Sequence, residues 1–267
     1  MSPLASRLLV AAALLPVVIG LVYLGDWWLF GLTLVGGLIA LHELYVMARE
    51  HRPLVLGGYL GFVVALLGVQ LGGLEWMLGG VLATLVFSFV VYGLSDVRPS
   101  ATTSFGVTLL GVVWVSAGLG FLLLIRDIPE FGFWAVMAVL FTVFAVDTGA
   151  FFVGRALGRH KMAPAISPGK SWEGFVGGVC AAMAMAFVIL YRDRDEFLSI
   201  PQTLALGATV ALASVLGDLF ESAVKRDLTV KDSGRLLGGH GGMLDRLDSL
   251  LWAGPAAFYV ILAFGHA

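Results

Sequence analysis

Continuous apolar runs of about 20 residues fill most of this sequence, and they constrain its fold more than any other feature. A helix that crosses ~30 Å of hydrocarbon needs about 20 mostly apolar residues, and in lipid it satisfies its own backbone hydrogen bonds. Strands of a membrane barrel would alternate in polarity, which these runs do not. Only 13% of the residues are charged, against about 25% in a typical soluble domain. The sequence therefore predicts an all-α, polytopic transmembrane helical bundle.

About nine spans are expected, in one integral membrane domain that covers residues 1–267, because no repeat or linker divides the chain. The expected spans lie near 6–24, 28–47, 54–72, 75–94, 105–125, 132–153, 173–191, 201–220 and 249–265. With a cytoplasmic N-terminus and alternating spans, all sixteen Lys and Arg residues fall on the cytoplasmic side except Arg126, Arg192 and Arg194. This predicts a multi-pass protein of the inner (plasma) membrane. The net charge of −2 gives no bias toward nucleic acid.

Two long polar loops, 154–172 and about 221–248, are expected on the cytoplasmic side, and long ordered loops are usually functional. The second loop begins as a continuation of the eighth predicted span. There, helical spacing places four polar residues on one face: Asp218, Glu221, Ser222 and Lys225. After the loop, Asp245 and Asp248 again share one face as the ninth span begins.

Carboxylates from two helix ends form a hard-oxygen site of the kind that Mg²⁺ prefers, together with substrate phosphates. Cations are interleaved with these carboxylates, which suits a polyphosphate ligand: Lys225, Arg226, Lys231, Arg235 and Arg246. Four glycines, among them Gly241 and Gly242, bracket His240, and such a backbone can present N–H groups to phosphate. A solvated loop would explain the cations but not the acidic residues among them. For His240, a catalytic role and a structural role in the turn both remain open.

The first polar loop contains Gly169-Lys170-Ser171, but it is not a P-loop, because Pro164 stands where that motif needs glycine. Two interpretations remain. Ser167, Lys170 and Ser171 form a phosphate-binding turn, or they form a helix cap with a lysine that only sets topology.

Other polar and small residues carry weaker signals. Asp147 lies inside the sixth predicted span, where either a functional site or helix packing explains an ionisable residue. Glu43, beside His42 at the end of the second span, is expected to be interfacial. The small-residue spacings that begin at Gly57 and Gly174 are assigned to helix packing.

The fixed positions between 222 and 248 resemble the signature of the phosphatidate cytidylyltransferase, or CDP-diacylglycerol synthase, family. They are SAVKR at 222–226, KDSG at 231–234 and HGGMLDRLD at 240–248. DTGA from Asp147, SPGKSWEG from Ser167 and GDLFES from 217 resemble secondary motifs of the same family. The resemblance covers the C-terminal half, about 132–267, and departs at Gly238, where the family often has proline.

This resemblance implies that CTP and phosphatidic acid react to CDP-diacylglycerol and pyrophosphate in the membrane lipid. It also implies dependence on Mg²⁺, a second cation such as K⁺, and a homodimer. We expect the metal ligands to be Asp218, Asp245, Asp248 and Glu221. We expect the catalytic residues to be Lys225, Arg226, Lys231, Asp232, His240 and Arg246. We expect substrate to be bound by Ser167, Lys170, Ser171, Ser222, Gly241, Gly242 and Asp147.

Two other functions compete with this interpretation. A CTP-using polyisoprenol kinase would share the nucleotide and metal features, and its lipid product would distinguish it. A transporter would place its charges near the bilayer midplane in two related halves, whereas the charges here gather at one end of the spans.

Overall fold

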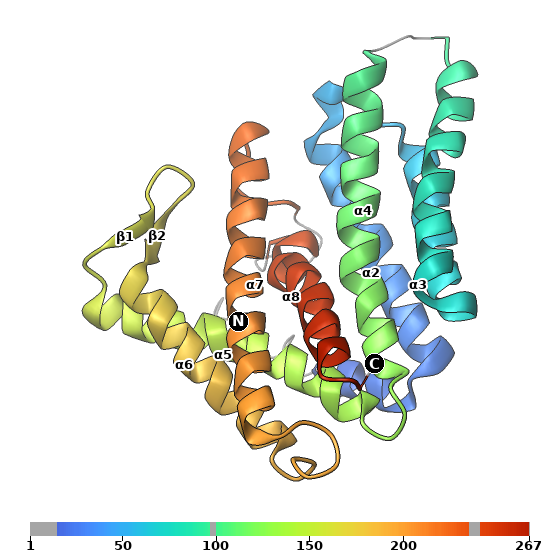
Figure 1. Cartoon of the computed structure of the whole chain (residues 1–267). Helices are drawn as coiled ribbons and strands as arrows, with labels where there is room; N and C mark the ends of the chain where they lie inside the picture. The colour runs from blue at the N-terminus through green and yellow to red at the C-terminus, as the bar shows by residue number, and fades with distance from the viewer. Residues whose placement is uncertain (1–14, 97–99, 235–240, 267) are drawn as a thin grey trace. The chain divides into compact units, whose positions relative to one another are not determined.

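The computed structural model describes residues 15–96, 100–234 and 241–266 (Figure 1). After a short apolar helix at Leu15–Leu24, the elements are α2 (Asp26–Met47), the 3₁₀ turn η1 (Arg49–His51), α3 (Val55–Gly93), α4 (Ala101–Arg126), α5 (Gly132–Leu157), β1 (Lys161–Ala163), β2 (Ser167–Ser171), α6 (Trp172–Leu190), α7 (Ile200–Asp227) and α8 (Leu244–Ala263). Within the described residues, six helices, α2 to α7, are long and apolar enough to cross a membrane. The predicted helical, multi-pass architecture is therefore confirmed, whereas the count of nine spans and the cytoplasmic N-terminus stay predictions.

Contacts between residues divide the chain into two compact units. Unit 1 comprises Met1–Leu124 and Val230–Leu247, and unit 2 comprises Ile125–Thr229 and Asp248–Ala267. The expectation of a single domain stays a prediction.

In unit 1, α3 is a helical hairpin that turns at Gly73, where φ is 75° and the backbone is not helical. A left-handed φ costs glycine little, so this residue permits the reversal. The two halves pack closely: a Cβ at Gly57 would lie 2.8 Å from the Cα atom of Ser88, and one at Gly61 would collide with Thr84. The packing role predicted for the Gly57–Gly61 spacing is confirmed.

Hydrogen bonds tie α2 and the start of α3 to α4 within unit 1. The Tyr45 hydroxyl donates to the Thr108 carbonyl at 3.0 Å, and the Leu54 N–H donates to the Thr108 hydroxyl at 2.8 Å. Leu41 and Leu44 are fully buried on the same helix as Tyr45. These contacts fix the C-terminal end of α2, which carries Glu43.

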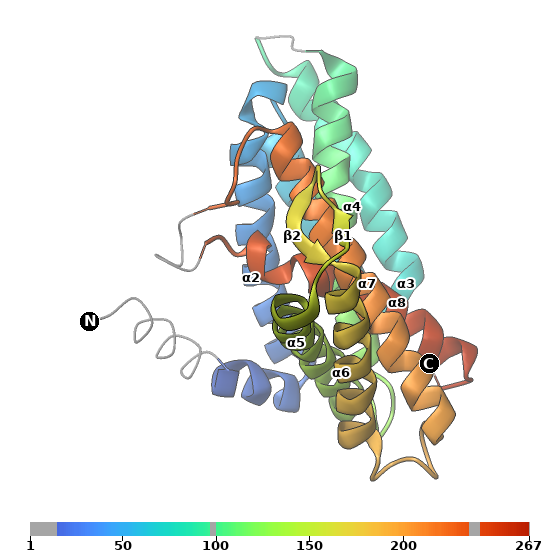
Figure 2. The same ribbon diagram turned by 90° about the vertical axis from the view of Figure 1, so that its left-hand side faces the viewer.

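In unit 2, α5 and α6 lie side by side, as Figures 1 and 2 both show. Glycines allow the close approach, because a Cβ at Gly174 would lie 2.8 Å from the Ala150 carbonyl oxygen, and one at Gly178 would lie 3.0 Å from that of Val146. The packing role predicted for this second glycine pair is confirmed too.

The loop before α6 is an antiparallel two-stranded hairpin. The all-α prediction did not include these two strands. Lys161 pairs with Ser171, and Ala163 pairs with Ser167. Ser171 then ends the strand and caps α6, since its hydroxyl accepts the Gly174 N–H at 3.2 Å. Residues 167–171 therefore form a strand rather than the predicted turn.

Helix α7 begins with a capping box between Ser199 and Gln202 and runs to Asp227. The predicted continuation of this helix into the polar segment is confirmed. Asp218, Glu221 and Lys225 consequently stand on regular helix.

Candidate functional site

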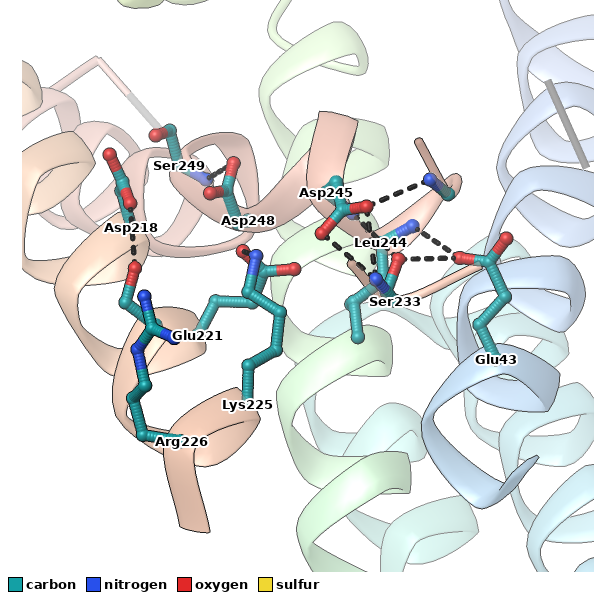
Figure 3. Close-up of polar contacts among 12 residues, drawn as sticks. Glu43, Asp218, Glu221, Lys225, Arg226, Ser233, Leu244, Asp245, Asp248 and Ser249 are labelled. Atoms are coloured by element: carbon teal, nitrogen blue, oxygen red, sulfur yellow. Dashed lines mark hydrogen bonds and ion pairs between the residues drawn. The ribbon is translucent and has the colours of Figure 1, made fainter. Parts of the chain in front are cut away.

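Four polar side chains near the end of α7 interact along one face. The Ser222 hydroxyl donates to Asp218 Oδ1 at 3.3 Å. The Lys225 ammonium lies 2.7 Å from Glu221 Oε2, and the side chain of Glu221 is only 2% exposed (Figure 3). The helical spacing of these residues produces both contacts.

The hairpin of unit 2 brings a cation to this face. The ammonium group of Lys170, on β2, lies 2.8 Å from Asp218 Oδ2 and also donates to the Val215 carbonyl at 3.4 Å. Arg226 Nε donates to the carbonyl of Ile166, in the hairpin turn, at 3.5 Å. The sequence left open whether this loop binds phosphate or only caps the next helix. Ser171 does cap α6. Lys170 forms an ion pair with Asp218 on α7 and so does more than set topology.

Glu173 anchors the base of the hairpin, a role that the sequence did not reveal. Its carboxylate accepts the backbone N–H groups of Arg159 at 3.1 Å and His160 at 3.2 Å, and it lies 2.6 Å from His160 Nδ1. A glutamate in the first turn of a helix usually serves that helix. Here it binds the chain that enters the hairpin, and so it fixes the strand that carries Lys170.

A cavity of about 570 Å³ lies among α5, the hairpin, α6 and α7 of unit 2. Charged residues from separate elements line it, together with Ser171 and apolar groups: Asp147, Arg155, Lys161, Lys170 and Asp218. The volume is that of a small-molecule site. Asp147, for which packing and function were both open, faces this cavity, as do three other predicted residues, Lys170, Ser171 and Asp218. Ser167 is not among the lining residues.

Asp248 lies beside α7 within unit 2, in the first turns of α8. Gly217 permits this approach, because a Cβ at 217 would lie 2.6 Å from the Asp248 carbonyl oxygen. The Asp248 carboxylate accepts the Ser249 N–H at 2.6 Å. Burial and the neighbouring Asp218 carboxylate raise the pKa of the Asp248 carboxyl to about 6. The two carboxylates are therefore close enough to repel each other when both are charged.

Asp245, one helical turn before Asp248, belongs to a hydrogen-bond network in unit 1. Its carboxylate accepts the N–H groups of Ser233, at 3.0 Å, and Gly242, at 2.8 Å. Ser233 Oγ in turn accepts the Asp245 N–H at 3.3 Å. Backbone groups thus hold the Asp245 carboxylate in place.

Glu43 belongs to the same network, and its side chain is buried within unit 1; its predicted level at the membrane interface stays a prediction. The residue is only 6% exposed. Its Oε2 accepts the Ser233 hydroxyl at 3.0 Å and the Leu244 N–H at 2.9 Å (Figure 3). These partners could not be predicted from the sequence around Glu43, because Ser233 and Leu244 lie 190 and 201 residues later in the chain.

The remaining predicted residues lie elsewhere or outside the described part. His240 and Arg235 are outside the described residues. Lys231, Asp232 and Arg246 are exposed. Gly241 has a φ of 80°, which favours glycine, and Gly242 is buried against Ser233. Within the described residues, no three His, Cys, Asp or Glu side chains gather as a metal-binding group, and Mg²⁺ binding stays a prediction.

The chain is similar to known cytidyl-transferring proteins over its whole length. The model of the cytidylyltransferase family matches residues 5–264. A phosphatidate cytidylyltransferase of Pseudomonas aeruginosa is 35% identical, with 98% of each chain covered. One from Mycobacterium bovis is 33% identical over 90% of this chain and 82% of its own length. One from Haemophilus influenzae is 44% identical, but there the match spans only 49% of this chain and 46% of the relative.

Proposed function

Because this chain belongs to the cytidylyltransferase family, we propose that it transfers the cytidylyl group of CTP to phosphatidic acid. The products are CDP-diacylglycerol and pyrophosphate. The observation that carries this proposal is the full-length similarity to relatives named for this reaction. The unit 2 cavity supports it, because Lys170 and Asp218 meet there from separate elements.

In the proposed reaction, a phosphate oxygen of phosphatidic acid attacks the α-phosphorus of CTP in line. The new P–O bond forms as the bond from the α-phosphorus to the bridging oxygen breaks, and pyrophosphate leaves with the electron pair. No general base is needed, since a phosphate monoester is mostly ionised near neutral pH. Lys170, Lys225 and Arg226 supply positive charge for the phosphates, because each lies on or against α7. We propose catalytic roles also for Lys231, Arg246 and His240, because they lie in the segment that resembles the family signature.

The carboxylates fit a divalent cation by their chemistry. Mg²⁺ takes one or two carboxylates together with substrate phosphates, and Asp218 and Asp248 form such a pair in unit 2. Asp245 follows one turn away on α8, and Glu221 follows Asp218 on α7. When bound, Mg²⁺ would neutralise phosphate charge. A second cation such as K⁺, a homodimer and a cytoplasmic site in the inner membrane complete the proposal. They rest on the family resemblance and the distribution of basic residues.

The proposal is tested with purified protein in detergent, radiolabelled CTP, phosphatidic acid and Mg²⁺, followed by lipid extraction. Label in CDP-diacylglycerol is expected, and EDTA should abolish it. A parallel reaction with a polyisoprenol and CTP labelled in the γ-phosphate distinguishes the kinase alternative, because a kinase transfers that phosphate, whereas CDP-diacylglycerol takes up label from the α-phosphate. Transfer to the prenol, or no label in either lipid with folded protein, would contradict the proposal.

A further inference from the structure

Glu43 is a buried acidic residue outside the cavity, and its environment is costly for stability. A buried carboxylate needs hydrogen-bond donors to offset its lost hydration. Oε2 has two such donors, but Oε1 has no hydrogen-bond partner among the described residues. An apolar side chain of similar size would pack there at lower cost. The carboxylate is therefore better explained by the groups that it holds than by stability alone.

The segment that Glu43 holds is shaped around its carboxylate. Gly234 and Gly242 both lie against it, so closely that a Cβ on either glycine would collide with a carboxylate oxygen. Leu244, whose N–H donates to Oε2, is the first residue of α8 and is fully buried. Glu43 thereby fixes where α8 begins.

The contact continues from Glu43 to Asp245 through Ser233. The Ser233 hydroxyl donates to Glu43 and accepts from the Asp245 N–H, while the Ser233 N–H donates to the Asp245 carboxylate. Figure 3 shows Ser233 between the two carboxylates. Displacement of Ser233 would remove one of the two backbone N–H groups that hold the Asp245 carboxylate, and would leave only that of Gly242.

We propose that Glu43 is a positioning residue, which holds Ser233 and Leu244 so that the Asp245 carboxylate keeps its orientation at the start of α8. This inference rests on the proposed function, in which Asp245 is a ligand of the cation that the reaction needs. Glu43 itself contacts neither substrate nor cation in this proposal. Its effect on the reaction is indirect and passes through two hydrogen bonds.

The test compares Glu43→Gln and Glu43→Leu with Tyr45→Phe. In Glu43→Gln the amide oxygen can replace Oε2 as acceptor, and we expect activity within about threefold of the unaltered protein. Glu43→Leu loses both hydrogen bonds, and we expect kcat to fall by ~100-fold, as for a misplacement of about 1 Å. The Mg²⁺ concentration for half-maximal activity should rise as well. Tyr45→Phe is the matched control, because it removes a buried hydrogen bond from the same helix to Thr108.

Hydrogen–deuterium exchange gives a readout that does not need activity. In Glu43→Leu the peptide covering 241–247 should exchange about tenfold faster, because the Leu244 N–H loses its acceptor, whereas Tyr45→Phe should leave it unchanged. If Glu43→Leu cannot be purified, Ser233→Ala takes its place, with the same expectation for the Gly242 and Asp245 amides. Unchanged exchange, or a loss of activity no larger than in Tyr45→Phe, would overturn the proposal. If the unaltered protein makes no CDP-diacylglycerol, the proposed function fails, but the exchange experiment still decides the role of Glu43.

Discussion

Gly217 lets the backbone at Asp248 approach α7 closely, and its replacement by alanine should disturb catalysis more than stability. The added Cβ would lie 2.6 Å from the Asp248 carbonyl oxygen and 3.0 Å from the Trp252 ring. Ordinary contact begins near 3.4 Å, so the start of α8 must move by about 0.8 Å. Overpacking of this size costs about 1–3 kcal/mol of folding stability. A shift of that order between catalytic groups can lower the rate by ~100-fold.

Two properties of Gly217→Ala are measured: the rate of CDP-diacylglycerol formation and the temperature of thermal unfolding. Gly57→Ala is measured in the same way, as the control. The second variant is matched, because a Cβ at Gly57 would lie 2.8 Å from the Ser88 Cα atom, in the α3 hairpin of unit 1. Both variants should unfold at lower temperature, but only Gly217→Ala should lose most of its kcat. Equal activity of the two variants at equal stability would refute the reasoning.

Three further outcomes are expected. Lys170→Met should lower kcat by about 10²-fold or more, because it removes a cation from Asp218; activity within threefold in a kinetic assay would contradict a role at the phosphates. Lys225→Met should destabilise the protein by about 3–5 kcal/mol, since the buried Glu221 carboxylate loses the ammonium group that compensates its charge. Adding Glu221→Gln to it should restore thermal stability but not activity; a double variant no more stable than the single one would refute the ion-pair explanation. Chelation of Mg²⁺ should stop turnover reversibly, and activity that persists in EDTA would argue against the cation.

Periodicity predicted the parts of the site that lie on one helix. Asp218, Glu221, Ser222 and Lys225 recur at helical spacing, so their common face on α7 followed from the sequence alone. The glycine spacings predicted close packing for the same reason, because a helix makes neighbours of residues four apart.

Partners far apart in the chain could not be predicted in this way. The sequence identified Lys170 as a candidate, but the pairing with Asp218 depends on how the hairpin folds. The strand itself was missed, because the proline and glycine between Ser167 and Ser171 argue against one. The burial of Glu43 was not predicted, because it depends on donors that the local sequence does not contain.

The hydrogen bonds of Glu43 also impose an order on synthesis of the chain. Its partner Ser233 is 190 residues later, and ribosomes add about 5–20 residues per second. Helix α2 therefore waits about 10–40 s with an acidic residue whose donors do not yet exist. During that interval water or the lipid headgroups must solvate the carboxylate, which keeps this end of α2 at the membrane surface. Burial of Glu43 is thus a late event, completed only when the segment that opens α8 has left the ribosome.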